Sequence, residues 1–350
     1  MSARNARPAH DDDVPSGELV RLQAPVGQGE AMARWIALAR RGRLPHGFLV
    51  TGPRGSGKST AMAWFAAALL CPSDLDTEAP CGVCRTCSQV ANHSHADVHV
   101  LELARDQAEK KMWGKERSFY AITVDQVRRA QETLQRHAVL GRARVLCIED
   151  ADSLSTEAQN ALLKTLEEPG QATFLLLEAV QPDRLLPTVH SRLQRLALLP
   201  LPEPMLRTHL QHRIPQHAAR FDAAVRVGRG SLGACMLACT EQVVQVHDLV
   251  LELLREHDRL RPLAMARAVL AGHRERHEQL DAARTFLWLL RSEVAAARDA
   301  LAVDAAGTYV GPPAEPWTTW IERTLEAERD LELQINPDQV LVACLVQFVR

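Results

Sequence analysis

Residues 48–60 read Phe48-Leu-Val-Thr-Gly-Pro-Arg-Gly-Ser-Gly-Lys-Ser-Thr60 and carry the most specific motif of the chain. They contain the pattern G-x-x-x-x-G-K-[ST] with nothing missing, and the motif lies between a short apolar run and a long apolar segment ending at Leu70. This order predicts a strand, a phosphate-binding loop and a buried helix. The glycines allow successive N–H groups to approach phosphate oxygens, and the helix adds its positive dipole end.

The loop predicts a site for ATP with Mg²⁺. In this motif the lysine reaches the β- and γ-phosphates and the serine hydroxyl lies on Mg²⁺, which assigns those roles to Lys58 and Ser59. The predicted nucleotide-binding residues are Gly52, Pro53, Gly55, Ser56, Gly57, Lys58, Ser59 and Thr60. A chance glycine-rich loop is the alternative, and the order of the flanking segments argues against it.

Composition and charge limit the number of domains and the classes of function that the chain can have. The chain has 350 residues, of which 46% are apolar, so it can form two or three domains that each have a core. Its net charge of −2 lacks the basic excess of a stand-alone nucleic-acid binder, so DNA contact would be shared with partners. We expect residues 1–22 to be a flexible polar tail rather than a signal peptide. The longest apolar run, Ala61–Cys71, is too short to span a bilayer.

A cysteine cluster follows the predicted P-loop helix. Its members are Cys71, Cys81, Cys84 and Cys87. Thiolates on such short turns can converge on one tetrahedral Zn²⁺, and four ligands close a structural site. A redox Cys-x-x-Cys pair and plain surface thiols are the alternatives, and a histidine (His93, His95 or His99) could replace one thiolate. Cysteines clustered at metal spacing also favour a reducing cytoplasm as the location.

An acidic run follows a second apolar strand candidate, residues 145–148. Carboxylates at the carboxyl end of such a strand can hold Mg²⁺ and polarise water. We therefore predict Glu149, with Ser59, as a Mg²⁺ ligand and Asp150 as a candidate catalytic residue. Acidic residues after a strand are also common in ordinary turns, and the upstream P-loop favours the functional interpretation.

The remaining pattern predicts a doubly wound α/β domain and a helical remainder. Helical periodicity over 123–140 and 156–168 alternates with a buried strand at 174–177, which is typical of a parallel sheet covered by helices. Pro200, Pro202 and Pro204 mark a domain boundary, after which the periodicity is helical only. The last helix is expected to begin at Asn336 with Pro337 in its first position.

Together these residues resemble the bacterial DNA polymerase III clamp loader, an AAA+ family. The similarity covers nearly the whole chain. It rests on Gly27-Gln28, Leu44-Pro45-His46, the P-loop, the four-cysteine insertion, and the segment Asn160-Ala-Leu-Leu-Lys-Thr-Leu-Glu-Glu-Pro169 with Leu-Pro-Thr-x-x-Ser191-Arg192 after it.

The resemblance implies an AAA+ domain at 23–199 with its zinc module at 71–99, a helical lid at 200–245 and an all-α collar at 246–350. It also implies partners: tau/gamma and delta subunits in a hetero-pentamer, the sliding clamp, and primer–template DNA reached through the complex. No membrane partner is implied.

The resemblance further implies that Arg192 acts in trans as an arginine finger on ATP held by a neighbouring subunit, where a guanidinium neutralises charge on the γ-phosphoryl group. A surface ion pair is the alternative for this residue alone. Three positions depart from the motor subunits of the family. The order Glu149-Asp150 replaces Asp-Glu, Ala179 replaces a polar sensor, and Gly233 replaces a lid arginine.

These departures favour a delta-prime-like subunit that binds nucleotide with weak or no hydrolysis. In that role the chain belongs to the DNA polymerase III holoenzyme and has little or no ATPase of its own. One alternative is an active tau/gamma-type ATPase motor of the same complex. Others are an AAA+ protein of DNA repair or regulation, and a zinc-dependent DNA-binding module, which the near-neutral charge disfavours.

Overall fold

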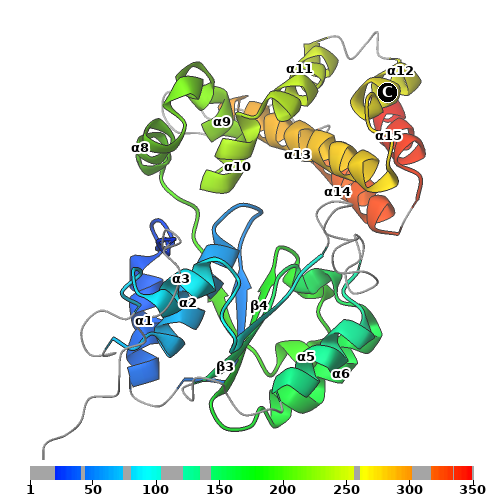
Figure 1. Cartoon of the computed structure of the whole chain (residues 1–350). Helices are drawn as coiled ribbons and strands as arrows, with labels where there is room; N and C mark the ends of the chain where they lie inside the picture. Colours follow the sequence, from blue (N-terminus) through cyan, green and yellow to red (C-terminus); the bar gives the residue numbers. More distant parts are fainter. Residues whose placement is uncertain are drawn as a thin grey trace, which may run out of the picture.

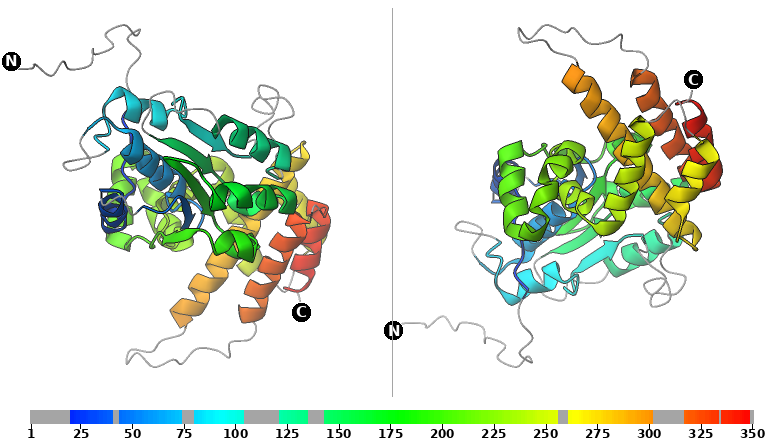
Figure 2. Two further views of the ribbon diagram at one scale, coloured as in Figure 1. Left: turned by 90° about the horizontal axis from the view of Figure 1, so that it is seen from below. Right: turned by 90° about the horizontal axis from the view of Figure 1, so that it is seen from above.

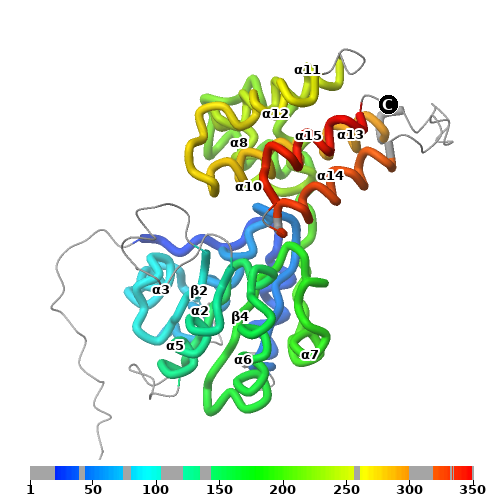
Figure 3. Tube along the Cα trace, turned by 90° about the vertical axis from the view of Figure 1, so that its right-hand side faces the viewer, coloured from blue at the N-terminus to red at the C-terminus, as the bar shows by residue number. Residues whose placement is uncertain are grey.

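The computed structural model describes residues 20–40, 44–73, 80–103, 121–134, 143–255, 261–301, 317–333 and 335–348. The expected tail at 1–22 lies almost wholly outside them. The described chain forms an α/β part and a helical part, and the helical part lies at one end of the α/β part (Figure 1, Figure 3).

The α/β part is built on one five-stranded sheet in the order β2-β3-β4-β1-β5. The strands are β1 (Gly47–Thr51), β2 (Val98–Leu101), β3 (Arg144–Ile148), β4 (Thr173–Ala179) and β5 (Gln194–Ala197). Every pairing is parallel. This confirms the predicted parallel α/β fold.

Two hydrophobic clusters cover the two faces of the sheet, because successive residues of a strand point to opposite sides. On β1, Phe48 and Val50 belong to one cluster and Leu49 to the other. The helices on the first face are α1 (Gly29–Arg40), α2 (Lys58–Leu70) and α3 (Arg85–Ala91). Those on the second are α5 (Val124–Leu134), α6 (Thr156–Glu167) and α7 (Pro187–His190) (Figure 1). The sheet is thus covered on both faces, as a doubly wound fold requires.

The helical part contains no strand among its described residues. Its elements are α8 (Glu203–Arg213), η4 (Pro215–Arg220), α9 (Phe221–Gly228), α10 (Leu232–Ala238), α11 (Glu241–Arg255), α12 (Pro262–Leu270), α13 (Arg276–Leu301), α14 (Trp317–Glu332) and α15 (Pro337–Val346). Helix α15 begins as predicted, with the Asn336 side chain accepting a hydrogen bond from the N–H of Asp338.

One hydrophobic cluster runs through the helical part, from Leu201 to Phe348. The boundary expected at residue 245 between lid and collar falls inside α11. The long helix α13 lies beside α14 and packs against α9 and α11, which joins the two expected units (Figure 2). The division into lid and collar therefore stays a prediction. None of the helices that the structure describes is both long and apolar enough to cross a membrane.

Candidate functional site

The P-loop connects β1 to α2 and has the backbone of a phosphate-binding loop. Gly55 and Gly57 have φ of 73° and 89°, a left-handed conformation that favours glycine. Gly57 is the N-cap of α2, and no side chain caps that helix end. The first turn of a helix leaves its N–H groups without intrahelical partners. Its amides are therefore suited to an anion such as a phosphate.

The loop also fits a ligand by its polar groups and space. The Ser56 hydroxyl oxygen is buried without a hydrogen-bond partner. A Cβ placed on Gly57 would meet nothing within 4 Å, so the helix end opens onto free space. The Lys58 ammonium donates to the Pro53 carbonyl oxygen at 3.2 Å, and its side chain is buried along the loop. Ser59 is exposed at the start of α2.

A buried glutamate that the motifs did not predict lies against this loop. The Ser59 hydroxyl donates to Glu178 Oε2 at 3.0 Å, and Glu178 is only 6% exposed. Burial raises the pKa of the Glu178 carboxyl, and this rise is opposed by the Lys58 charge and the Ser59 hydrogen bond. Glu178 ends the apolar run at 174–177 on β4, the strand next to β1. A charged residue directly after an apolar run is the sequence feature that could have indicated Glu178 as a site residue.

The predicted acidic residues after β3 take different positions. Glu149 is buried, and its N–H donates to the Leu101 carbonyl at 2.8 Å. Asp150 is exposed and has a left-handed backbone with φ of 52°. Asp152 accepts hydrogen bonds from the N–H groups of Val180 and Gln181 at 3.0 and 2.8 Å. Asp152 thus holds the chain that leaves β4, whereas the roles of Glu149 and Asp150 stay predictions.

The helical part rests directly on the P-loop. The N–H of Gly233 donates to the Gly55 carbonyl at 2.9 Å, and the Ser231 hydroxyl donates to the Arg54 carbonyl at 2.8 Å. A Cβ on Gly233 would lie 2.7 Å from the Gly55 oxygen, which is closer than real contacts allow. Position 233 in this arrangement therefore accepts only glycine. Ala179, the other departure from the motor pattern, is buried at the end of β4.

The four predicted cysteines meet in one cluster. The Sγ atom of Cys71 lies 3.7 Å from that of Cys81 and 3.9 Å from that of Cys84, and the Sγ atoms of Cys81 and Cys87 are 4.0 Å apart. A tetrahedron with Zn–S bonds of about 2.3 Å has sulfur–sulfur edges of about 3.8 Å. The cluster thus fits zinc. All four cysteines are free thiols, so a disulfide does not explain their proximity.

No histidine joins this group among the residues that the structure describes. The local fold explains why the thiols converge: Cys71 caps the end of α2, and Cys84 caps the start of α3 by accepting the N–H of Cys87 at 3.5 Å. Burial raises the pKa of Cys87. At Cys81, N–H groups of Val83 and Cys84 outweigh the effect of burial and lower the pKa to about 6.

Arg192 lies away from the P-loop of its own chain. Its carbonyl oxygen is 3.2 Å from the Cβ position of Gly47, where β1 begins, whereas the P-loop follows the end of β1. The guanidinium is exposed, pairs with Glu167 at 2.5 Å and donates to the Thr188 carbonyl at 2.8 Å. The structure therefore places the predicted arginine finger at the surface, apart from the other site residues.

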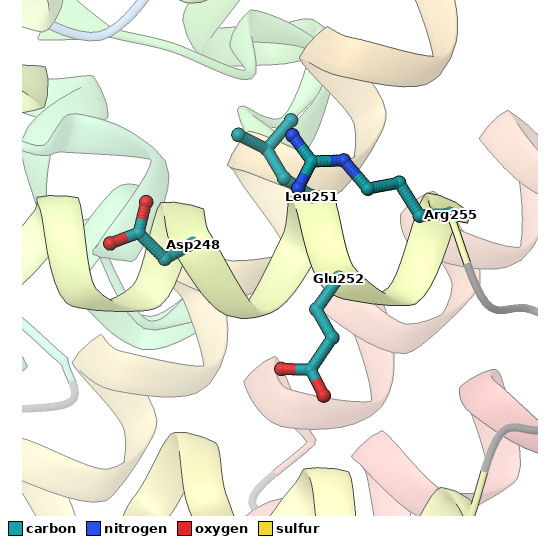
Figure 4. A pocket seen from close by; sticks show the side chains of 4 residues that line it. All are labelled: Asp248, Leu251, Glu252 and Arg255. Atoms are coloured by element: carbon teal, nitrogen blue, oxygen red, sulfur yellow. The ribbon is translucent and has the colours of Figure 1, made fainter.

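A hollow on α11 is lined by Asp248, Leu251, Glu252 and Arg255 (Figure 4). These side chains project from a single helix and do not converge on one point (Figure 4). We assign no ligand to it.

The fold and the loop define a P-loop protein with a parallel α/β sheet. The chain belongs to the family described as DNA polymerase III, delta subunit, whose model matches residues 27–202. The resemblance to DNA polymerase III clamp-loader proteins is thereby confirmed.

Individual relatives agree with this membership. The chain is 37% identical over 238 residues to DNA polymerase III subunit delta' of Pseudomonas aeruginosa, covering 66% of this chain and 68% of that protein. It is 33% identical over 201 residues to the delta' subunit of Escherichia coli, covering 57% of this chain and 56% of that protein. To the tau/gamma subunit of Haemophilus influenzae it is 29% identical, covering 64% of this chain and 31% of that protein.

Solved structures are similar only loosely. A gamma-subunit-related protein of Thermotoga maritima has a TM-score of 0.47 at 12% identity, over 91% of this chain and 98% of that one. RuvB of the same organism has a TM-score of 0.39 at 13% identity, over 91% and 86%. Similarity at this level is too weak to add to the assignment.

Proposed function

We propose that this chain is a delta-prime-like subunit of the DNA polymerase III clamp loader, which assists ATP-driven loading of the sliding clamp onto primed DNA. One observation carries the proposal: the phosphate-binding loop is complete, whereas the positions expected to serve hydrolysis hold Asp150, Ala179 and Gly233. A carboxylate shortened by one carbon is displaced from the position that a water-orienting base needs. The chain then binds nucleotide and hydrolyses it weakly or not at all.

Two bound groups belong to this proposal. ATP with Mg²⁺ would be held by the loop amides, Lys58 and Ser59, with Glu149 as a further Mg²⁺ ligand. Zn²⁺ would be held by the four-cysteine cluster, in which three sulfur–sulfur distances are 3.7 to 4.0 Å and all four sulfur atoms lie within 4.8 Å of one another. The zinc role is structural, because four thiolates close the coordination sphere.

Arg192 would act on ATP held by the neighbouring tau/gamma subunit. Its exposure and its distance from its own P-loop support a role in trans. The pair with Glu167 would hold the guanidinium in place until that neighbour binds.

We expect Arg192→Ala to leave assembly of the complex intact and to lower its DNA-stimulated ATPase about 1,000-fold at the site it serves, the lower range for an arginine finger. Arg184→Ala, which changes another exposed arginine of the same chain, serves as the control. An unchanged ATPase rate in the reconstituted complex would remove Arg192 from this role.

The remaining partners follow from the same proposal: tau/gamma and delta subunits in a hetero-pentamer, the clamp, and primer–template DNA, in the cytoplasm. Exposed apolar side chains on and after α14 support a contact surface on the helical part. They are Leu325, Leu333, Ile335 and Val346. Mixing the chain with tau/gamma and delta tests this. A stable complex that loads the clamp supports the proposal, and failure to assemble contradicts it.

The second candidate is a tau/gamma-type motor. The tau/gamma relatives favour it, since the matching region is 29% identical in Haemophilus influenzae and 31% identical in Mycobacterium tuberculosis. ATP turnover by the isolated chain separates the two candidates.

A further inference from the structure

Glu178 is a buried carboxylate in direct contact with Ser59, one of the two predicted Mg²⁺ ligands. It projects from β4, which lies between β3 and β1 in the sheet. The P-loop follows β1 and the predicted acidic residues follow β3, so the carboxyl end of β4 lies between them. Glu178 is thus placed where the two halves of the nucleotide site meet.

The direction of the Ser59–Glu178 hydrogen bond determines how Ser59 can act. A carboxylate only accepts hydrogen bonds, so the Ser59 hydroxyl proton points to Glu178 Oε2 at 3.0 Å. The lone pairs of the hydroxyl oxygen then point away from Glu178 and stay available. Mg²⁺ takes oxygen ligands in an octahedron and is held in P-loop sites by the serine together with a carboxylate. Glu178 therefore orients Ser59 as a cation ligand.

The charges around Glu178 make a metal-free triphosphate unfavourable. Its carboxylate is attracted by the positive charge of Lys58 and repelled by the negative charges of Asp150 and Asp152. Without a cation, phosphate oxygens brought to Ser59 would meet the negative charge of Glu178, which contacts Ser59, in a partly buried site where like charges repel strongly. With Mg²⁺ bound between the carboxylates and the phosphate oxygens, both groups are attracted to the cation.

We propose that Glu178 is the carboxylate that positions Ser59 on Mg²⁺ and makes nucleotide binding depend on that ion, beside Glu149 as the predicted Mg²⁺ ligand. The inference rests on the proposed function to the extent that the chain must bind nucleotide. It assigns Glu178 as a positioning residue, because it acts through Ser59.

The test is the affinity of the full-length chain for a fluorescent ATP analogue, measured once with Mg²⁺ and once with EDTA. The wild-type chain should bind much more tightly with Mg²⁺. In Glu178→Gln the ratio of the two dissociation constants should fall about tenfold or more, the size typical of losing a partner of a metal ligand. Part of that fall should come from tighter binding in EDTA, which damage to the fold would not produce.

Three further variants complete the design. Glu168→Gln makes the same chemical change at the exposed C-cap of α6 and should keep the wild-type ratio. Glu178→Asp keeps the charge but shortens the side chain, so it should stay Mg²⁺-dependent with weaker binding, and it replaces Glu178→Gln should that variant not fold. Glu149→Gln tests the predicted Mg²⁺ ligand separately.

The outcomes are distinct. An unchanged ratio in Glu178→Gln, or a ratio lost only in Glu149→Gln, overturns the inference and leaves the proposed function intact. Absence of nucleotide binding by the wild-type chain in both buffers overturns the nucleotide part of the proposed function and this inference with it.

Discussion

We expect nucleotide binding to depend most on Lys58. Its ammonium group donates to Pro53 at 3.2 Å and can instead donate to phosphate oxygens when these enter the loop. Charge-assisted hydrogen bonds of this kind are the strong ones. We expect Lys58→Ala to weaken ATP binding about 100-fold, which corresponds to about 2.7 kcal/mol. Titration with a fluorescent ATP analogue measures this. Lys164→Ala, at an exposed position of α6, should bind as wild type. Equal affinity of the Lys58 variant would show that the loop holds no phosphate.

Cys84 combines two roles, as a predicted zinc ligand and as the N-cap of α3. Cys84→Ser keeps a capping oxygen but replaces a thiolate ligand. We expect the variant to lose its bound zinc and to melt at a lower temperature, because metal affinity contributes to folding. Elemental analysis and thermal melting measure both. Cys239→Ser, outside the cluster, should keep the zinc. A wild-type chain purified without zinc would contradict the assignment.

At the scale of elements, the contact of α10 with the P-loop depends on glycine at position 233. A methyl group there would meet the Gly55 oxygen at 2.7 Å, so α10 must move away. We expect Gly233→Ala to break the hydrogen bond from Gly233 to Gly55 and to speed hydrogen exchange of the amides at residues 231–235. Gly29→Ala, at a glycine with no neighbour within 4 Å, should leave that exchange unchanged. Unaltered exchange in Gly233→Ala would mean that α10 does not rest on the loop in solution.

The elements also show what sequence could predict. The interior strands β1, β3 and β4 were predicted because strands buried on both faces read as continuous apolar runs. Strands β2 and β5 were missed, and both lie at the edges of the sheet. β5 reads Gln-Arg-Leu-Ala and is largely exposed, so it has no such run. Edge strands pair with one neighbour only, and charged or polar residues on them block pairing with another chain.

In the candidate site, features set by nearby residues were predicted, whereas contacts between distant parts of the sequence were missed. The P-loop and the cysteine cluster were predicted because their geometry comes from short spacing along the chain. The Ser59–Glu178 contact was missed because it joins residues 119 positions apart, and only the strand order brings them together. The contact of Gly233 with Gly55 depends on the placement of the helical part and was equally beyond local patterns.

At the scale of the whole molecule, a buried ionic group joins the expected lid and collar. Glu293 on α13 accepts a hydrogen bond from Arg226 on α9 at 3.1 Å and lies 2.7 Å from His247 Nε2 on α11. Removing one member of a buried, hydrogen-bonded group costs about 1–3 kcal/mol. We expect Glu293→Gln to lower the free energy of unfolding by that amount in chemical denaturation. Glu203→Gln, at an exposed pair with Arg207, should change nothing measurable. An unchanged free energy of unfolding in Glu293→Gln would mean that this ionic group does not help to hold the two units together.

The same group predicts acid sensitivity. Burial alone would raise the pKa of Glu293, but the hydrogen bonds from His247 and Arg226 outweigh it and lower the pKa below the ordinary value of 4.5. A lowered carboxyl pKa contributes stability that is present above the unfolded-state pKa and is lost as pH falls through the folded-state pKa. Stability of the wild-type chain should therefore drop below about pH 4.5 more steeply than that of Glu293→Gln. Parallel curves for the two proteins would contradict this.

We propose above all that this chain retains a phosphate-binding loop but lacks the groups that hydrolyse ATP. Steady-state phosphate release by the isolated full-length chain at saturating ATP and Mg²⁺ tests it most directly. We expect a rate no higher than that of the Lys58→Ala variant. Brisk turnover that Lys58→Ala abolishes would contradict it and identify the chain as a motor subunit.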